Sequence, residues 1–480
     1  MINNIFHDKE GLKIINNNDV KKIHKNSLYI LENLGIKVEG DSIFDLLFDF
    51  GCDIDKVNKI VRIKEDIVMK ALELCPKAFY IYDQNGKKYE IGKGKTYFTS
   101  AGKINKILDF NTNKIRNTTI EDTRNFIKIL DYLDEIDFVR SIASVSTTGN
   151  TKLDILYTIK EMFLNTNKHI IENPLSYLEA KILIDLTKII MENKYWPIIT
   201  IQISPTAPLI IIKEILKIIM LCIENDVPIL ILSLGLSGGT FPMTLAGSIT
   251  LTNVEILFTI VLIQALKKGH PIIYGSSTSP LYMRNCVVSR GTPEYGLIIN
   301  SVVEMAKFYK LPSYTGPGTT DSVKIDVQSG IQKMFLHMAA ISNGLTICSG
   351  EGQLATAMLC SFEQLLIDNE IIKYIKRFFK GVNINNDTLA IDSIIKAKQG
   401  GNFLYDDKTL KYMKDPEEYY ISEIFNIGGL SGKCEDVIKN ANKSVEFILK
   451  NYKPFISNDK KEKVLDFVKQ YEVMIRSNNG

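Results

Sequence analysis

Side chains with hydroxyl, amide and carboxylate groups recur directly after short apolar runs that have the composition of buried strands. In parallel α/β proteins, the residues at the carboxyl ends of the strands face one side of the sheet, where ligands bind. These positions are Ser144, Ser146, Thr147, Glu172, Asn173, Gln202, Ser204, Thr206, Gly235, Ser237, Gly238, Gly239, Ser276, Ser277, Thr278, Tyr314, Gly316, Gly318, Thr319, Ser349 and Glu351. The set contains no His and no Cys pair, so neither a metal site nor a Cys–His nucleophile is predicted.

Two glycine-rich segments follow predicted strands, at Leu236–Met243 and Gly316–Asp321. Backbone N–H groups in such turns can bind an anion or a flat ligand. Neither segment has the GxGxxG or GK[ST] spacing, and tight backbone packing is the alternative interpretation. The candidate contacts to a large ligand are Ser237, Gly238, Gly239, Thr240, Ser276, Gly316 and Gly318.

Aromatic residues lie at predicted strand ends and in loops, among them Tyr97, Tyr274, Tyr295 and Tyr314. A cage of aromatic faces binds a quaternary ammonium group by cation–π attraction, worth about 2 kcal/mol per desolvated contact. Packing in the core is the alternative for each ring.

Polar partners for such a ligand are also present. The carboxylates that could balance its positive charge are Glu294, Asp321 and Glu351, and Gln202 adds an amide. For each carboxylate, a helix cap or a surface group is the alternative. If the ligand itself carries a carboxylate, Arg284 or Arg290 could bind it.

Composition limits the class of protein. The chain has 480 residues, 45% of them hydrophobic, and a net charge of +3 that gives no basic surplus for nucleic acid. Its seven cysteines are dispersed without a CxxC pair, and its five histidines do not cluster, so disulfides and structural zinc are not expected. The N-terminus has no signal-peptide pattern, and the apolar stretch Trp196–Ile223 is interrupted by Pro and Lys. A cytoplasmic protein with no membrane span is therefore predicted.

The chain divides into three parts by its pattern. Residues 1–94 have helical spacing and a hairpin signal around Asp83–Gly86, which predicts an N-terminal helical cap with a small β element. Residues 95–378 alternate eight apolar runs with helical stretches such as Leu153–Phe163, Leu178–Met191, Leu209–Cys222 and Leu245–Leu266. This alternation predicts an α/β fold, a (β/α)8 TIM barrel, with an open six-stranded sheet as the alternative. Residues 379–480 are predicted to form a helical extension packed on the barrel.

Several segments, in order over nearly the whole chain, resemble the trimethylamine:corrinoid methyltransferase family. They are Ile23–Ile36, Leu232–Ser248, Pro271–Thr278, Gly291–Leu297, Phe308–Ser313, Leu311–Gly330, Ser361–Ile371 and Gly401–Leu404. The family is a barrel that transfers a methyl group from an amine to the Co(I) of a separate corrinoid protein. In this sequence, Thr319 occupies the position that matches the family's pyrrolysine.

The resemblance therefore implies a member without pyrrolysine, similar to the enzymes that demethylate glycine betaine and related quaternary amines. A quaternary nitrogen is already fully charged and needs no activating electrophile, so desolvation and alignment suffice. Thr319 and Asp321 are then the candidate catalytic residues, and the loop Ser237–Thr240 is the candidate corrinoid contact. A cognate corrinoid protein is the implied partner, with cobalamin supplied by that partner rather than bound tightly; a homo-oligomer is possible.

The sequence also departs from the family pattern near the predicted pocket. Gln332 replaces a usual glutamate, and Ala355 stands at a usually acidic position within Cys348–Ala357. A usual tryptophan near Ile427 is absent. Glu351 is the candidate to replace the missing acidic side chain. A relative that binds a betaine-like ligand or a corrinoid protein without methyl transfer is the alternative function.

Overall fold

The structure, a computed structural model, describes residues 2–3, 11–192, 197–416, 418–427 and 435–477. Eight parallel strands form a closed barrel, in which the last strand pairs with the first. They are β7 (Lys95–Ser100), β10 (Phe138–Val139), β11 (His169–Glu172), β12 (Ile199–Ile203), β14 (Ile229–Ser233), β16 (Ile272–Ser276), β19 (Ser313–Thr315) and β20 (Ile347–Glu351). The predicted (β/α)8 barrel is confirmed, and the open sheet is wrong.

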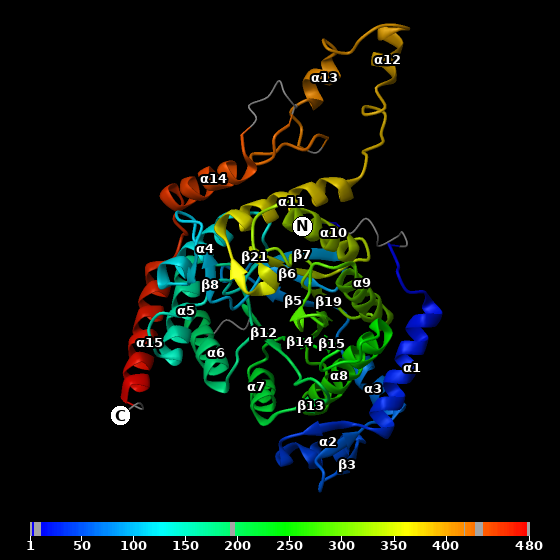
Figure 1. Ribbon diagram of the computed structural model, residues 1–480, viewed down its shortest axis with the longest axis vertical. Coiled ribbons are helices and arrows are strands. Elements are labelled where there is room, and N and C mark those ends of the chain that lie inside the picture. Colours follow the sequence, from blue (N-terminus) through cyan, green and yellow to red (C-terminus); the bar gives the residue numbers. More distant parts are fainter. Residues whose placement is uncertain (1, 4–10, 193–196, 417, 428–434, 478–480) are drawn as a thin grey trace.

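A helix follows each barrel strand and packs on the outside of the barrel (Figure 1). The helices are α4 (Ile120–Tyr132), α5 (Thr151–Asn165), α6 (Tyr177–Met191), α7 (Lys213–Glu224), α8 (Leu245–Leu266), α9 (Pro293–Phe308), α10 (Val327–Ile341) and α11 (Phe362–Lys380). Helix α7 begins at Lys213 rather than at the predicted Leu209, because β13 (Ile210–Ile211) pairs with an N-terminal strand.

Among the described helices, α8 alone is long and apolar enough by composition to cross a membrane. Its mean hydropathy is 1.9 over the most apolar window, and 78% of that window is buried inside the protein. It packs between α1, α3 and the barrel wall, as a core helix does.

The N-terminal part covers one side of the barrel. Its helices are α1 (Asn17–Asn33), α2 (Phe44–Phe50) and α3 (Glu65–Leu74), and its strands are β1 (Ile2–Asn3), β2 (Ile36–Val38), β3 (Asp53–Asp55), β4 (Ile60–Arg62), β5 (Phe79–Tyr82) and β6 (Lys88–Ile91). Asn16 caps α1 with its side chain, which accepts hydrogen bonds from Asn18 N and Asp19 N.

The β5–β6 hairpin closes the N-terminal end of the barrel. Its inward side chains Ile81, Tyr89 and Ile91 form one buried cluster with Tyr97 and Phe138 of the barrel strands. The hairpin also bonds to the segments before two strands: Tyr82 N donates to Pro197 O at 3.0 Å, before β12, and Gln84 N donates to Asn167 O at 2.7 Å, before β11. An apolar plug therefore fills the floor of the barrel.

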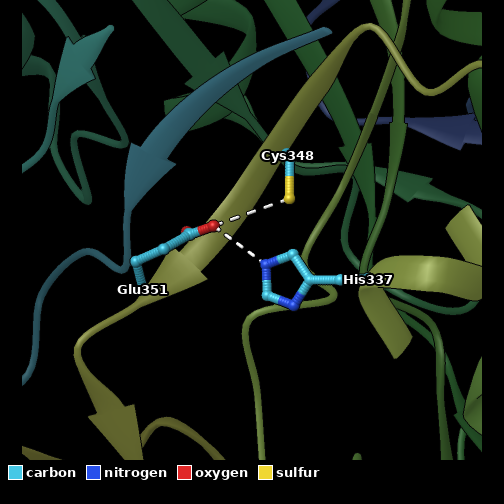
Figure 2. A group of neighbouring side chains, drawn as sticks. All are labelled: His337, Cys348 and Glu351. Carbon is cyan, nitrogen blue, oxygen red and sulfur yellow. Dashed lines mark hydrogen bonds and ion pairs between the residues drawn. The ribbon is translucent and has the colours of Figure 1, made fainter. Parts of the chain in front are cut away.

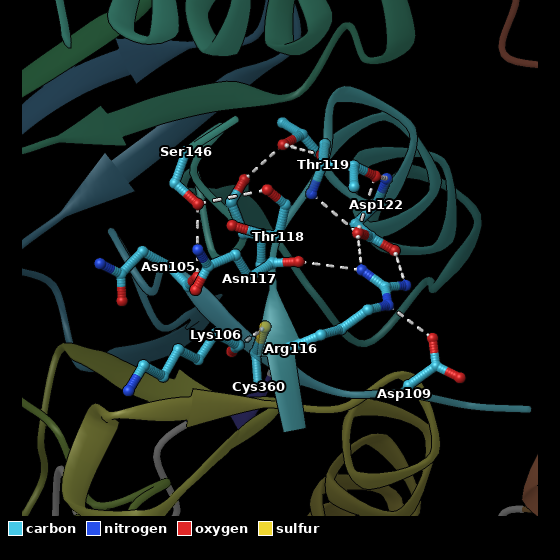
Figure 3. Close-up of polar contacts among 12 residues, drawn as sticks. Asn105, Lys106, Asp109, Arg116, Asn117, Thr118, Thr119, Asp122, Ser146 and Cys360 are labelled. Carbon is cyan, nitrogen blue, oxygen red and sulfur yellow. Dashed lines mark hydrogen bonds and ion pairs between the residues drawn. The ribbon is translucent and has the colours of Figure 1, made fainter. Parts of the chain in front are cut away.

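Two small sheets surround the opposite, C-terminal end. One consists of β15 (Leu236–Ser237), β17 (Ser279–Tyr282) and β18 (Val287–Val288). The other consists of β21 (Gln353–Leu354), β22 (Leu359–Cys360), β8 (Lys106–Leu108) and β9 (Ile115–Asn117). Arg116 fixes the β8–β9 hairpin to α4, with Nη1 2.6 Å from Asp122 Oδ2 and Nε 2.6 Å from Asp109 Oδ2 (Figure 3).

The C-terminal part is helical, with α12 (Ile391–Ala397), α13 (Asp407–Tyr412), α14 (Val437–Asn451) and α15 (Asn458–Ser477). Helix α14 packs on α4 and α11, and α15 packs on α5 and α6. The segment with α12 and α13 instead extends away from the barrel (Figure 1). The division of the chain at 94/95 and 378/379 stays a prediction.

Three residues that the sequence interpretation used, His7, Trp196 and Cys434, lie outside the described residues. The six described cysteines are free thiols. Of the described histidines, His24 is half-buried and His169, His270 and His337 are buried.

Candidate active site

A cavity of about 140 Å³ opens at the C-terminal end of the barrel, where barrel enzymes hold their active sites. Its polar lining comes from Arg140, Asn173, Gln202, Ser277, Arg290, Tyr295, Tyr314, Ser349 and Gln353. No acidic side chain stands among the described residues that line it. The cavity is therefore polar and carries positive charge.

Arg140 is the principal charged group of this cavity. It directly follows β10 and is 5% exposed. Its guanidinium donates hydrogen bonds to the Tyr314 hydroxyl and, over 3.2 Å, to Asn173 Oδ1, while Nε has no acceptor among the residues described. These partners are neutral, and no described carboxylate forms an ion pair with Arg140. A buried cation without a counter-ion is costly unless a ligand supplies the negative charge.

Neutral polar and aromatic groups complete the walls. The guanidinium carbon of Arg140 lies 5.8 Å from the centre of the Tyr314 ring. Tyr295, on α9, donates from its hydroxyl to Gly316 O at 3.2 Å, and burial raises the pKa of this phenol. Gln202, on β12, is 5% exposed, and its Oε1 accepts no hydrogen bond from the described residues. Two tyrosine rings and an unsatisfied amide thus lie beside the guanidinium.

Arg290 is the second cation of the cavity and lies on the loop that precedes α9. Its Nε donates to Ser279 Oγ at 3.0 Å. The prediction that Arg290 could bind a ligand carboxylate stays a prediction, although the residue is at the cavity. Arg284 is exposed and is not part of the cavity lining.

The loop after β19 places Thr319 in the protein interior. Gly318 N donates to Ser349 O at 3.0 Å, and a Cβ on Gly318 would lie only 2.6 Å from Gly350 C, so this contact requires glycine. Thr319 is fully buried, and its hydroxyl has no partner in the described part of the chain. Gly316 lines the cavity, whereas Gly318 and Thr319 are not part of its lining.

The Asp321 carboxylate connects the loop before α9 to the segment around Thr356. Its carboxylate accepts hydrogen bonds from Ser289 Oγ at 2.5 Å, Arg290 N at 2.7 Å, Gly291 N at 3.0 Å and Thr356 Oγ1 at 2.9 Å. These four donors occupy the acceptor capacity that a general base would need. Asp321 does not line the cavity; it positions Arg290, and its catalytic role stays a prediction.

The candidate corrinoid-contact segment lies at the rim. Ser237 is buried and its hydroxyl is 2.7 Å from Ser248 Oγ, while Gly239 and Thr240 are exposed. Gly238 has φ +91°, which favours glycine. Ser276 is fully buried and accepts a hydrogen bond from Thr278 N, so it is not at the surface.

Four predicted substrate contacts lie away from the cavity. Tyr97 points to the floor and donates to Glu90 O at 3.1 Å. Tyr274 points out of the barrel and donates to Asn253 Oδ1 of α8 at 2.8 Å. Glu294 is exposed on the first turn of α9, and Glu351 is buried against α10. Tyr295, Tyr314 and Gln202 are the predicted contacts that the structure does bring together.

The sequence interpretation missed Arg140 and Gln353, both of which line the cavity. It placed the end of the second strand near Ser144, whereas β10 is only two residues long and ends at Val139. The signal that could have found Arg140 is its position directly after Phe138 and Val139. Gln353 follows an irregular strand end, where simple alternation fails.

The fold and the cavity define a barrel protein with a small-molecule site at the strand ends. The family model described as trimethylamine methyltransferase (MTTB) matches residues 1–475, and the chain belongs to this family. It is 31% identical over 461 residues to trimethylamine methyltransferase MttB2 of Methanosarcina mazei, covering 92% of this chain and 91% of that protein.

Two relatives from Desulfitobacterium hafniense carry different names. The chain is 29% identical over 451 residues to trimethylamine methyltransferase MttB, covering 92% of this chain and 90% of that protein. It is 28% identical over 416 residues to a glycine betaine methyltransferase, covering 85% of each chain. The two names describe a tertiary amine and a quaternary amine.

Proposed function

We propose that this protein transfers a methyl group from a quaternary amine that carries a carboxylate, of the glycine betaine type, to the Co(I) of a corrinoid protein. Family membership and the named relatives support methyl transfer from an amine. The observation that carries the choice of amine is the buried Arg140, which lacks a counter-ion in a cavity without acidic lining residues. A zwitterion supplies the missing negative charge.

The cavity offers one partner for each end of such a substrate. The Arg140 guanidinium, with Arg290 nearby, binds the carboxylate, since charge-assisted hydrogen bonds to a guanidinium are strong and directional. The faces of Tyr295 and Tyr314 then contact the trimethylammonium group, where cation–π attraction replaces lost hydration. This arrangement orients one N–CH3 bond toward the open end of the barrel.

The reaction requires little acid–base catalysis from the protein. The partner's Co(I) is the nucleophile that accepts the methyl group, and a tertiary amine leaves without needing a proton. The residues of this chain desolvate the ammonium, hold its carboxylate and exclude water. Thr319, in place of the electrophile of the pyrrolysine-containing members, agrees with a substrate that is already fully charged.

Exposed apolar side chains at the rim of the cavity support the proposal that a corrinoid-carrying domain docks there. Leu234, Met243 and Met283 are 38%, 56% and 51% exposed beside the glycine-rich segment 237–240. Exposed methionines adapt to flat ligands and to partner surfaces. These side chains and the small residues next to them would contact the corrinoid face; nothing here requires cobalamin to bind tightly to this chain. A cytoplasmic location is part of the same proposal.

The test is loss of Co(I) absorbance when free cob(I)alamin is mixed with the protein and one amine at a time. Glycine betaine, carnitine and proline betaine are expected to react, while choline and tetramethylammonium, which lack a carboxylate, react at least tenfold more slowly. Equal rates for choline and glycine betaine would remove the role given to Arg140. Reaction with trimethylamine would contradict the argument from Thr319.

Binding without transfer is the second candidate function. The change to Ala355, at a position that is usually acidic in the family pattern, favours it. Calorimetric binding of glycine betaine, together with silence in the Co(I) assay both with free cobalamin and with the corrinoid partner, would establish this alternative.

A further inference from the structure

Three potential metal ligands meet between β20 and α10. His337 lies on α10, and Cys348 and Glu351 lie on β20 (Figure 2). Glu351 Oε1 is 3.2 Å from His337 Nε2 and 3.5 Å from Cys348 Sγ, and the three ligand atoms lie within 4.8 Å of one another. All three side chains are fully buried.

The hydrogen bonds of His337 show which ring nitrogen presents a lone pair to the cluster. His337 Nδ1 is 2.7 Å from the backbone carbonyl of Lys333, which can only accept, so Nδ1 carries the proton. Nε2 of the neutral ring then presents a lone pair to Glu351 Oε1, which is itself an acceptor when ionised. Either a proton or a metal cation must lie between them. A ring N–H donated to a carbonyl is also how metal-bound histidines are oriented.

The neighbouring cation on α10, Lys333, binds other groups. Lys333 Nζ is 2.7 Å from Asp368 Oδ2 and 2.7 Å from Gly318 O, so this cation is already paired. A divalent cation would neutralise one thiolate and one carboxylate together, which removes the cost of burying them.

We propose that His337, Cys348 and Glu351 bind a divalent metal ion of the zinc class. Tetrahedral zinc with ordinary bond lengths sets N···O separations of about 3.3 Å and S···O separations of about 3.6 Å. The observed 3.2 and 3.5 Å agree with these two edges, and the third, between His337 Nε2 and Cys348 Sγ, is within 4.8 Å. Glu351 Oε2 is buried without a hydrogen-bond partner in the described residues, and water would complete the tetrahedron around the metal.

The mixture of donors selects the metal. One thiolate, one imidazole and one carboxylate suit Zn²⁺ and its transition-metal neighbours, whereas Mg²⁺ and Ca²⁺ require oxygen ligands. The sequence interpretation predicted no metal because it examined strand ends alone. His337 comes from a helix, and only the folded chain places it against Cys348 and Glu351.

The metal would fix one wall of the active-site cavity. Ser349 and Gly350, which line the cavity, lie in the chain between the two β20 ligands. The pairing of β20 with β7 shifts register between Ser349 and Glu351, so this strand end is irregular. Clamping Cys348 and Glu351 to α10 holds that irregular segment in place. The proposal does not depend on the proposed function.

The test uses the full-length protein, purified with a non-chelating reductant and assayed for metal by mass spectrometry. About one zinc per chain is expected. After removal of zinc, added Co²⁺ should give a thiolate-to-cobalt absorption band, which zinc abolishes by displacement. Cys348→Ser should lose the band, Glu351→Gln should bind cobalt at least tenfold more weakly, and Cys222→Ser, a buried cysteine elsewhere, should keep it.

The thermal midpoint of the wild-type protein provides a readout that needs no variant. Removal of zinc should lower the midpoint, and stoichiometric zinc should restore it. Wild-type protein that contains no transition metal, gives no cobalt–thiolate band and shows no zinc-dependent midpoint would overturn the proposal. A cobalt–thiolate band of equal strength in Cys348→Ser and wild type would overturn it as well.

Discussion

The two ends of the barrel differ in the charge and polarity of the groups that fill them. At the C-terminal end, Arg140 Nε, Gln202 Oε1, Thr319 Oγ1 and Gln353 Oε1 are buried without partners among the described residues. At the N-terminal end, apolar side chains of the β5–β6 hairpin fill the floor, and the Tyr97 hydroxyl is hydrogen-bonded. The unpartnered buried atoms near this end, Gln84 Oε1 and His270 Nδ1, belong to neutral side chains. One end is built for stability and the other for a ligand.

This difference has an energetic meaning. A buried donor or acceptor without a partner costs about 1–3 kcal/mol, so a folded protein tolerates several together only where something else offsets the cost. A bound substrate at the C-terminal end would satisfy them. Substitutions at the floor should therefore change stability, and substitutions at the C-terminal end should change binding.

Phe138→Ala, at the floor, is expected to have the largest effect. Removing a buried ring should lower the free energy of unfolding by about 3–5 kcal/mol, measured by chemical denaturation. Affinity for glycine betaine in the remaining folded protein should be unchanged. Phe378→Ala, at a side chain 65% exposed, is the matched control and should leave stability unchanged. A loss of affinity without a loss of stability would contradict the comparison.

Arg140→Met should affect binding most. The affinity for glycine betaine, measured by calorimetry, should fall about 100-fold or more, which corresponds to about 3 kcal/mol for a buried charge contact. Stability should stay equal or rise, because an unpaired buried charge is removed. Arg124→Met, which breaks a peripheral ion pair with Glu161, should leave the affinity unchanged. Unaltered affinity in Arg140→Met would show that the ligand lies elsewhere.

Acidic pH should lower the free energy of unfolding, because His169 at the floor of the barrel becomes protonated on unfolding. Its ring contacts Tyr82 O and Thr200 Oγ1, and burial lowers its pKa to about 4. Between pH 4 and 6.5 the unfolded chain binds more protons, so stability is complete above 6.5 and falls toward pH 4, by up to about 3 kcal/mol.

The difference in unfolding free energy between wild type and His169→Gln isolates this contribution. That difference should decrease as the pH falls through this range. His270, whose pKa burial also lowers to about 4, is present in both proteins and cancels. A difference that is independent of pH would remove His169 as the cause.

Removing one tyrosine hydroxyl at each end of the barrel should have smaller effects, on affinity at the C-terminal end and on stability at the N-terminal end. Tyr314→Phe removes an acceptor of Arg140 and should weaken glycine betaine binding about tenfold, with the ring retained. Tyr97→Phe removes the hydroxyl bonded to Glu90 O and should cost about 1 kcal/mol of stability without changing affinity. Equal effects of the two changes on affinity would break the comparison.

Thr319→Val should have the smallest effect on folding. The exchange replaces an unpartnered buried hydroxyl by a methyl group of similar shape, so stability should change by less than about 1 kcal/mol or increase. If the hydroxyl contacts the substrate, kcat with glycine betaine falls while stability is retained. An unchanged kcat would remove Thr319 from the candidate catalytic residues.

The sequence predicted the fold because the spacing of apolar residues along the chain reflects the strands and helices that they form. The eight predicted apolar runs correspond to the eight barrel strands, and α8 has its predicted bounds. The side chains were harder to place. In a strand buried on both faces, composition does not show which residues point inward. Thus Ile273 points into the barrel and its neighbour Tyr274 points to α8.

By itself the sequence determined the barrel and the family. It did so because periodicity and ordered motifs are local properties of the chain. The tertiary structure alone decided that Arg140 is buried without a counter-ion, and that His337 meets Cys348 and Glu351. Those properties depend on distances between residues far apart in sequence and on the exclusion of water, which exist only once the barrel has closed.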